Sequence, residues 1–180
     1  MVADIVEATA ALHNPETGSL CAAVFVDEHL LFTAAHCVRG LDVGGVVQIK
    51  PHSSDLAEGK VVEVLPDSDL AAVLVETVGA HGVAPLGSLP VRGQHVLVVG
   101  HPLGMDFSFS SGDVAAVRKM RDVLEDEDIS PDTLVIQTTA PISPGNSGGG
   151  MFDESGRLLG IASFTMRRGS NLGFFVAVVR

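Results

Sequence analysis

Residues 144–153, with the sequence PGNSGGGMFD, are the stretch that decides the fold of this chain. They place Ser147 among glycines, with Gly145 two residues before it. Glycines allow a sharply turned backbone, so such a loop can expose a serine hydroxyl and point N–H groups at the same place. A serine hydroxyl is a poor nucleophile at neutral pH and needs a general base and an acid that orients the base. The loop therefore predicts a nucleophile whose partners lie elsewhere in the chain.

Two other segments supply the partners that this loop needs. LFTAAHC, residues 31–37, contains His36, and DSDLAAVLV, residues 67–75, places Asp69 at the head of an apolar run. A histidine, an aspartate and a serine in this chain order occur in one known type of catalytic triad, that of chymotrypsin. The three segments are specific as a set, although a serine in a glycine-rich turn alone would indicate little.

These segments resemble the chymotrypsin-like serine peptidases, and within them the bacterial HtrA/Deg-like branch. TTAPISPGNSGGG (138–150) resembles the nucleophile loop of that branch, GHPLG (100–104) its glycine–proline turn, and SSGDVAAVRK (110–119) the strand that follows. LLGIASF (158–164) and NLGFF (171–175) resemble the two segments that form the pocket walls. The resemblance covers most of residues 18–178 and implies an all-β, chymotrypsin-like fold of two six-stranded antiparallel barrels.

The resemblance also implies roles for individual residues. Ser147 would be the nucleophile, His36 the general base and Asp69 the acid; we favour Asp69 over Asp67 because the family's acid directly precedes the strand. Backbone N–H groups of the segment Gly145, Asn146 and Ser147, chiefly those of Gly145 and Ser147, would form the oxyanion hole. Because residue 146 is asparagine rather than aspartate, it cannot pair with a newly freed N-terminus, so we expect no activation by N-terminal cleavage.

A substrate pocket is expected beside Ser147. By motif position its base lies near Pro141, and its walls comprise Ser163, Phe164, Thr165, Gly173, Phe174 and Phe175. None of these residues is acidic, so the pocket predicts a small or medium apolar side chain before the scissile bond rather than arginine or lysine. Which of the two adjacent phenylalanines faces the pocket stays open at this point.

Cys21 and Cys37 are the only cysteines in the sequence. The resemblance implies a disulfide between them, because the family commonly pairs the cysteine after the catalytic histidine with one sixteen residues earlier. A structural disulfide indicates an oxidising compartment. We therefore expect a periplasmic or secreted protein whose export signal or anchor is absent from this sequence.

The composition excludes several classes of partner. The net charge is −11, and we find no basic cluster that could neutralise phosphates, so nucleic acid is not an expected partner. No stretch reaches the ~20 apolar residues of a membrane-spanning helix, so this chain is not expected to insert into a membrane. The sequence implies no metal site and no cofactor. His95, in an apolar segment, is expected to be packed. The N-terminus lacks the aromatic residues through which HtrA-type relatives form trimers, which favours a monomer.

The chain divides at one proline- and glycine-rich connector, residues 81–95. Residues 1–80 are expected to form a first barrel with His36 and Asp69, and residues 96–180 a second barrel with Ser147, with no PDZ domain. Six short strands are predicted on each side of the connector. Residues 2–12 could be a short helix or an entry strand, and we favour a strand. Spacing alone would indicate only a barrel or a sandwich.

The sequence thus predicts a serine endopeptidase that cleaves extended or unfolded protein segments through an acyl-enzyme. The alternative is a protease-fold binding module, or a latent protease whose oxyanion hole requires a partner. An esterase of the α/β-hydrolase type is disfavoured, because the G-x-S-x-G elbow is absent and the histidine precedes the serine.

Overall fold

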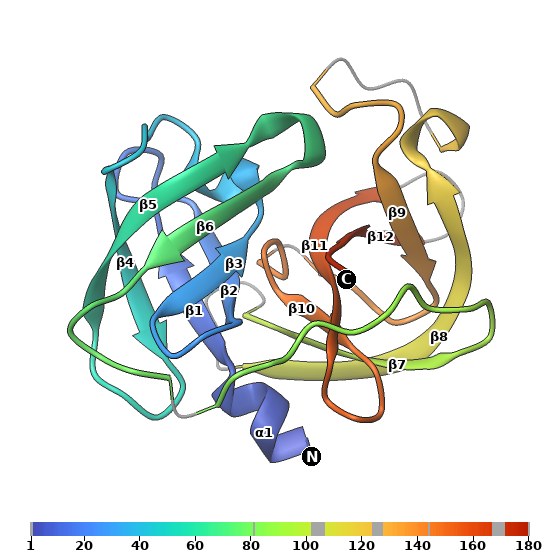
Figure 1. Ribbon diagram of the computed structural model, residues 1–180, viewed down its shortest axis with the longest axis horizontal. Helices are drawn as coiled ribbons and strands as arrows, with labels where there is room; N and C mark the ends of the chain where they lie inside the picture. Colours follow the sequence, from blue (N-terminus) through green and yellow to red (C-terminus); the bar gives the residue numbers. More distant parts are fainter. Residues whose placement is uncertain are drawn as a thin grey trace.

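The computed structural model contains two closed antiparallel β-barrels that lie side by side (Figure 1). It describes residues 2–80, 82–101, 107–123, 128–143, 145–166 and 172–179. The first barrel has the strand order β1 (Thr9–His13), β2 (Leu20–Phe25), β3 (Leu30–Thr33), β6 (Leu70–Leu74), β5 (Ala57–Leu65) and β4 (Val46–Pro51). The second has the order β10 (Gly150–Phe152), β11 (Leu158–Met166), β12 (Leu172–Ala177), β9 (Leu134–Thr138), β8 (Ser108–Lys119) and β7 (His95–Gly100). The predicted double-barrel fold is confirmed.

Alternating burial explains why these segments form barrel walls. In β4 exposed and buried residues alternate without a break, and Val47 and Ile49 point inward with no exposed surface. Val47 and Ile49, β-branched residues that favour strands, thereby fill the interior, whereas Gln48 and Lys50 face solvent. One cluster of buried side chains extends from the first barrel to Leu97, Val99 and Phe152 of the second. The two barrels are therefore joined by a continuous apolar core.

The prediction for the N-terminal segment is corrected by the structure. Residues Val2–Glu7 form the helix α1, and only Thr9–His13 form a strand. The helix buries a single side chain, Ile5, and Thr9 donates its hydroxyl proton to the Ile5 carbonyl at 2.8 Å. A short surface helix needs to bury only the side chains on one face, whereas an entry strand would have needed alternate residues to be buried.

His95 is also placed differently from the prediction. It is the first residue of β7, and its side chain is 44% exposed. Its register partner on β8 is Asp113, whose carboxylate lies 3.0 Å from the His95 Nδ1. A position at the start of a strand explains why the apolar residues that follow are buried while His95 is not.

In the described part of the chain, no helix is long and apolar enough to cross a membrane. Short 3₁₀ turns, η1 (Ala35–Val38), η2 (Pro66–Ser68) and η4 (Met120–Asp122), interrupt the connections between strands. The turn η1 contains His36, and η2 directly precedes Asp69.

Candidate active site

His36 lies on η1, the 3₁₀ turn that follows β3. The next residue, Cys37, is fully buried and forms a disulfide with Cys21 of β2. The disulfide therefore joins the turn that carries the histidine to a neighbouring strand. The His36 side chain keeps 32% of its surface exposed, so one edge of the imidazole is open to a cleft.

Asp69 follows η2 and adopts a left-handed conformation with φ of 51°. Among the described residues it is the one non-glycine residue with positive φ. Aspartate tolerates this region better than most residues, but the conformation persists because the surroundings impose it. The Ala35 N–H donates to the Asp69 carbonyl at 3.0 Å, and the Asp69 N–H donates to Pro66 at 3.0 Å. Hydrogen bonds at both its N–H and its carbonyl therefore hold the backbone of Asp69 in place.

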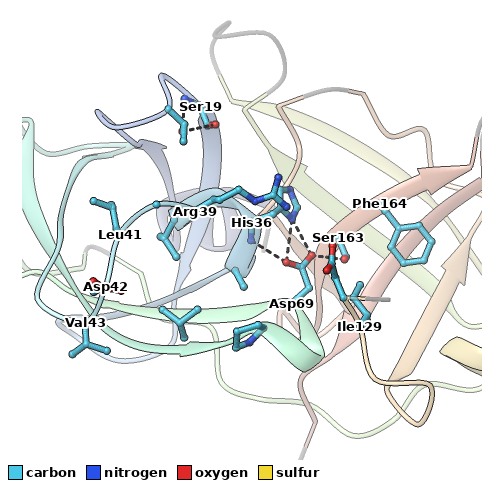
Figure 2. A pocket seen from close by; sticks show the side chains of 17 residues that line it. Ser19, His36, Arg39, Leu41, Asp42, Val43, Asp69, Ile129, Ser163 and Phe164 are labelled. Atoms are coloured by element: carbon cyan, nitrogen blue, oxygen red, sulfur yellow. Dashed lines mark hydrogen bonds and ion pairs between the residues drawn. The ribbon is translucent and has the colours of Figure 1, made fainter. Parts of the chain in front are cut away.

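The carboxylate of Asp69 accepts three kinds of hydrogen bond. The His36 backbone N–H donates to Oδ1 at 3.0 Å, and the imidazole Nδ1 lies 2.9 Å from Oδ2. The Ser163 hydroxyl donates to Oδ2 at 2.5 Å (Figure 2). A carboxylate at this position requires the proton on Nδ1, which leaves the Nε2 lone pair free to accept one.

Electrostatics favour an ionised Asp69. Burial by itself raises the pKa of this carboxyl, since only 7% of the residue is exposed. The hydrogen bonds and charge of His36, together with the Ser163 hydroxyl, outweigh burial, so the pKa of Asp69 lies below its ordinary value. An anion at this site can orient the imidazole and stabilise an imidazolium.

Asp67, the rival acid, has another environment. It is exposed, and within the described ranges the carboxylate that the His36 imidazole contacts is that of Asp69, not that of Asp67. Its carbonyl instead accepts hydrogen bonds from the Ser130 N–H at 2.6 Å and the Thr133 hydroxyl at 3.1 Å. The segment between β8 and β9 of the second barrel thus holds the turn that carries Asp69.

Ser147 lies in a loop that is bonded to both barrels. Its carbonyl accepts from the Ala22 N–H of β2 at 2.8 Å, and the Gly148 N–H donates to Ala162 of β11 at 2.9 Å. Gly148 has a φ of 80°, and a Cβ there would collide with the Ala22 carbonyl and the Thr33 hydroxyl. A glycine after the serine is therefore required by the close approach of the first barrel.

Ser147 lines one hollow and His36 lines the larger cleft beside it. Across the described residues, the Ser147 hydroxyl makes no hydrogen bond to the imidazole. The hollow that Ser147 lines and the cleft that His36 lines share Ser163 and Phe164 as walls. In enzymes without substrate such contacts are often long and tighten only when substrate binds.

The N–H groups around Ser147 differ in availability. Those of Gly145 and Ser147 have no acceptor within the part of the chain that the structure describes. Gly145 has a φ of 95°, a region that glycine enters without cost. The Asn146 N–H donates to the Ser143 carbonyl at 3.1 Å, so of the three predicted residues Asn146 has its N–H engaged within the loop. The Asn146 side chain is buried against Gly100.

The hollow beside Ser147 has a lining that differs in part from that of the predicted substrate pocket. A hollow of about 220 Å³ is lined by Ile142, Ser143, Ser147, Ala162, Ser163, Phe164 and Phe174. Pro141 is exposed and is not among these lining residues, and its carbonyl accepts a hydrogen bond from the Ser110 hydroxyl at 3.0 Å. Its neighbour Ile142 lines the hollow and lies against Gly173.

The structure separates the two adjacent phenylalanines. Phe174 lines the hollow and stacks on Phe164, with ring centroids 4.8 Å apart. Phe175 is fully buried in the core of the second barrel, because neighbouring residues of a strand point to opposite faces. The Thr165 side chain lies outside the described residues, although its backbone pairs with Gly173. Ile142, Ser143 and Ala162 were not predicted, and only their places beside motif residues could have indicated them.

A larger cleft of about 1060 Å³ lies next to this hollow (Figure 2). His36, Asp69, Ser163 and Phe164 form part of its lining. The remaining walls are Thr17, Ser19, Ala35, Val38, Arg39, Gly40, Leu41, Asp42, Val43, Val64, Pro66, Asp128 and Ile129.

Cys21, His36 and Cys37 bring possible metal-ligand atoms within 4.8 Å of one another. Metal binding by cysteine requires a thiolate. Both sulfurs are bonded to each other in the disulfide, so these residues do not fit a metal site.

Comparison with known proteins identifies the family. The profile of the trypsin-like peptidase domain matches residues 21–161. This chain belongs to the trypsin-like peptidase family. It is 35% identical over 145 residues to a serine protease HtrA-like protein of Staphylococcus epidermidis, which covers 76% of this chain and 24% of that protein. It is 30% identical over 172 residues to a probable periplasmic serine endoprotease DegP-like of Halomonas elongata, with coverages of 92% and 34%.

Solved structures agree with this assignment. The HtrA-type protease AlgW, solved with a tripeptide, superposes with a TM-score of 0.83 at 26% identity, over 98% of this chain and 58% of AlgW. A serine-to-alanine mutant of Rv3671c from M. tuberculosis, in its inactive form, has the same fold, with a TM-score of 0.84 at 18% identity, over 98% of this chain and 84% of that one. These relatives place the chain in the HtrA/Deg branch. It spans about a quarter to a third of the length of the curated relatives named here.

Proposed function

We propose that this chain is a serine endopeptidase whose catalytic triad is Ser147, His36 and Asp69. The observation that supports it most is the bonded series from Ser163 through Asp69 to the imidazole Nδ1, at 2.5 and 2.9 Å. This series leaves Nε2 as the proton acceptor, facing the cleft that adjoins the hollow of Ser147.

In this mechanism the Ser147 oxygen attacks the carbonyl carbon of the scissile peptide bond, and its proton passes to His36 Nε2. The Asp69 carboxylate stabilises the imidazolium that forms. The N–H groups of Gly145 and Ser147 would bind the oxyanion, and losing one such donor typically costs about 3 kcal/mol. When the carbon–nitrogen bond breaks, His36 returns the proton to the leaving amine. Water then attacks the carbonyl carbon of the acyl-enzyme and gives a proton to His36. When the ester bond breaks, His36 returns this proton to the Ser147 oxygen and the acid product leaves.

The hollow beside Ser147 supports a preference for a small or medium apolar residue before the scissile bond. Ile142, Ala162 and Phe174 are apolar, and no charged residue is among its described lining. The backbone of β11 at Ser163–Thr165 would pair with the acyl side of the substrate as an added strand. Such pairing requires an extended chain, so unfolded or loosely folded protein segments are the expected substrates.

An extracytoplasmic location is part of the proposal. The Cys21–Cys37 disulfide supports it, because structural disulfides persist in oxidising compartments. A relative named as a probable periplasmic endoprotease supports it further.

Labelling with a fluorophosphonate, read by intact mass, tests the proposed function. The wild-type chain should gain a single adduct, and Ser147→Ala should gain none. Ser143→Ala is the matched control, since Ser143 lines the same hollow and should leave labelling intact. Folded wild-type protein without an adduct would contradict the proposal and would favour a latent protease or a binding module.

A further inference from the structure

Arg39 is the one lysine or arginine among the described residues that line the large cleft. Its backbone is held firmly: the buried Asn14 side chain donates to the Arg39 carbonyl at 2.9 Å and to the Cys37 carbonyl at 3.1 Å. Its guanidinium, by contrast, makes no ion pair or hydrogen bond within the described ranges. An anchored backbone thus presents an unpaired cation to the cleft.

Arg39 and the proposed general base line the same cleft and are joined through the backbone. His36 lies on a 3₁₀ turn, and the Arg39 N–H donates to the His36 carbonyl at 3.4 Å. Arg39 is the C-cap that directly follows this turn, three residues after His36, and its backbone continues in an extended conformation with ψ of 137°. Figure 2 shows the Arg39 side chain extended toward the His36 imidazole. A substrate group that passes over His36 therefore comes next to the guanidinium.

The same figure indicates which part of a substrate this would be. Phe164 and Ile129 lie on one side of His36, and Arg39 and Ser19 on the other (Figure 2). The acyl side of the substrate would follow β11 past Phe164. The leaving amine must lie against His36, which returns a proton to it, so the residues after the scissile bond run toward Arg39.

We propose that Arg39 selects substrates with an acidic side chain in the first two positions after the scissile bond. This inference rests on the proposed peptidase function. A guanidinium suits a carboxylate because its planar N–H donors match both oxygens. Asp42 also lines the cleft and Glu16 lies beside Gly40, but neither is ion-paired with Arg39. The net charge of −11 repels acidic peptides at long range, so the preference must arise from local contact.

Quenched-fluorescent, C-terminally amidated peptides test this proposal. Each carries valine before the scissile bond, and Asp, Asn or Lys at the first or second position after it. The expected kcat/KM ratio of Asp to Asn is about threefold to fivefold, the range of an exposed ion pair, and it should shrink as salt is raised. Arg39→Ala should bring the ratio close to one, Arg39→Lys should keep most of it, and Arg39→Glu should favour Lys instead.

Two controls isolate the role of Arg39. Arg92→Ala removes the same charge from an exposed turn that is not part of the cleft lining, and should keep the ratio. The C-terminal carboxylate of a short peptide could also bind Arg39. Peptides without charged side chains that end shortly after the scissile bond, with either a free C-terminal carboxylate or an amide, test this. A preference seen only with the free terminus would overturn the assignment to an acidic side chain.

Binding of the same amidated peptides to Ser147→Ala, followed by fluorescence anisotropy, gives the Asp-to-Asn ratio without turnover. A ratio of one in both cleavage and binding overturns the role of Arg39 and leaves the peptidase assignment intact. Absence of cleavage and of a phosphonate adduct would instead remove the proposed function, while the binding ratio still decides whether Arg39 recognises a carboxylate.

Discussion

Asp69→Asn is the substitution that tests the proposed site most directly. Asparagine has nearly the shape of aspartate, but one carboxylate oxygen becomes an NH₂ donor. The Ser163 hydroxyl and the imidazole Nδ1 both contact Oδ2 of Asp69, at 2.5 and 2.9 Å. If the NH₂ takes this place, Nδ1 must accept a hydrogen bond, and the imidazole proton moves to Nε2. An Nε2 that carries a proton cannot take one from Ser147.

The size of the effect follows from the charge that is lost. Two unit charges ~4 Å apart near a protein surface interact by about 4 kcal/mol, which corresponds to about 10³-fold in rate. The wrong tautomer adds to this loss, and the equivalent change in a known triad costs about 10⁴-fold. We therefore expect kcat/KM to fall by about 10³- to 10⁴-fold, mainly through kcat.

The assay is hydrolysis of a fluorogenic peptide with valine before the scissile bond, with enzyme concentration fixed by phosphonate titration of the wild type. Asp67→Asn is the matched control, because Asp67 is two residues away and bonds to the opposite barrel only through its carbonyl. It should stay within about twofold of wild type, as surface changes usually do. A loss below tenfold for Asp69→Asn, or equal losses in both variants, would refute the assignment of the acid.

Three further predictions follow from contacts around the site. The pKa of Asp69 is held below its ordinary value of 3.8, so the stability that its carboxylate contributes is complete above pH 3.8 and is lost as pH falls through the lowered pKa. Between pH 6 and pH 2 the melting temperature should therefore fall more steeply for wild type than for Asp69→Asn, and parallel curves would contradict this. Replacing Cys21 and Cys37 by alanine should cost about 3 kcal/mol in the chain-entropy model, seen as a lower denaturant midpoint, and reduced wild type should match the double variant. Thr133→Val removes one hydrogen bond to the Asp67 carbonyl and should lower kcat/KM about twofold to fivefold. Thr133→Ser keeps the hydroxyl and should stay close to wild type, whereas equal losses in both variants would show that packing, not the hydroxyl, matters.

The double barrel and its strands could be predicted because both signals are local. Short apolar runs separated by turn residues mark the strands, and the motif around Ser147 has a spacing that few other folds share. The N-terminal segment shows the limit of this signal. Val2, Ile5 and Val6 favour a strand by residue type, yet residues 2–7 form a helix. Ile5 is buried, Val6 packs against the core, and the Ala8 N–H and the Thr9 hydroxyl donate to the carbonyls of Asp4 and Ile5.

The pocket shows a second limit of sequence-based prediction. Motif position places Pro141 at its base, but a loop does not fix side-chain direction as a strand does. Ile142, one residue further, points into the hollow instead. On β12, by contrast, strand alternation decides between Phe174 and Phe175 once the register with β9 and β11 is known.

The contacts that could not be predicted join segments far apart in the chain. The Thr133 hydroxyl and the Asp67 carbonyl are 66 residues apart, and Ser163 and Asp69 are 94 apart. No periodicity or composition relates such pairs, because they meet only after both barrels have formed and packed together. Arg39 belongs to the same class, since the cleft that makes its charge significant contains residues of both barrels.

The site lies between the two barrels, and each barrel supplies part of it. His36 and Asp69 come from the first barrel, whereas Ser147 and Ser163 come from the second. Hydrogen bonds from Ala22 to Ser147, from Ser163 to Asp69, and from the β8–β9 segment to the turn of η2 all cross between the two. A small shift of one barrel would lengthen all of these bonds together. The shared apolar core therefore maintains the distances within the site, and the chemistry proposed for Ser147 depends on packing that no site residue makes by itself.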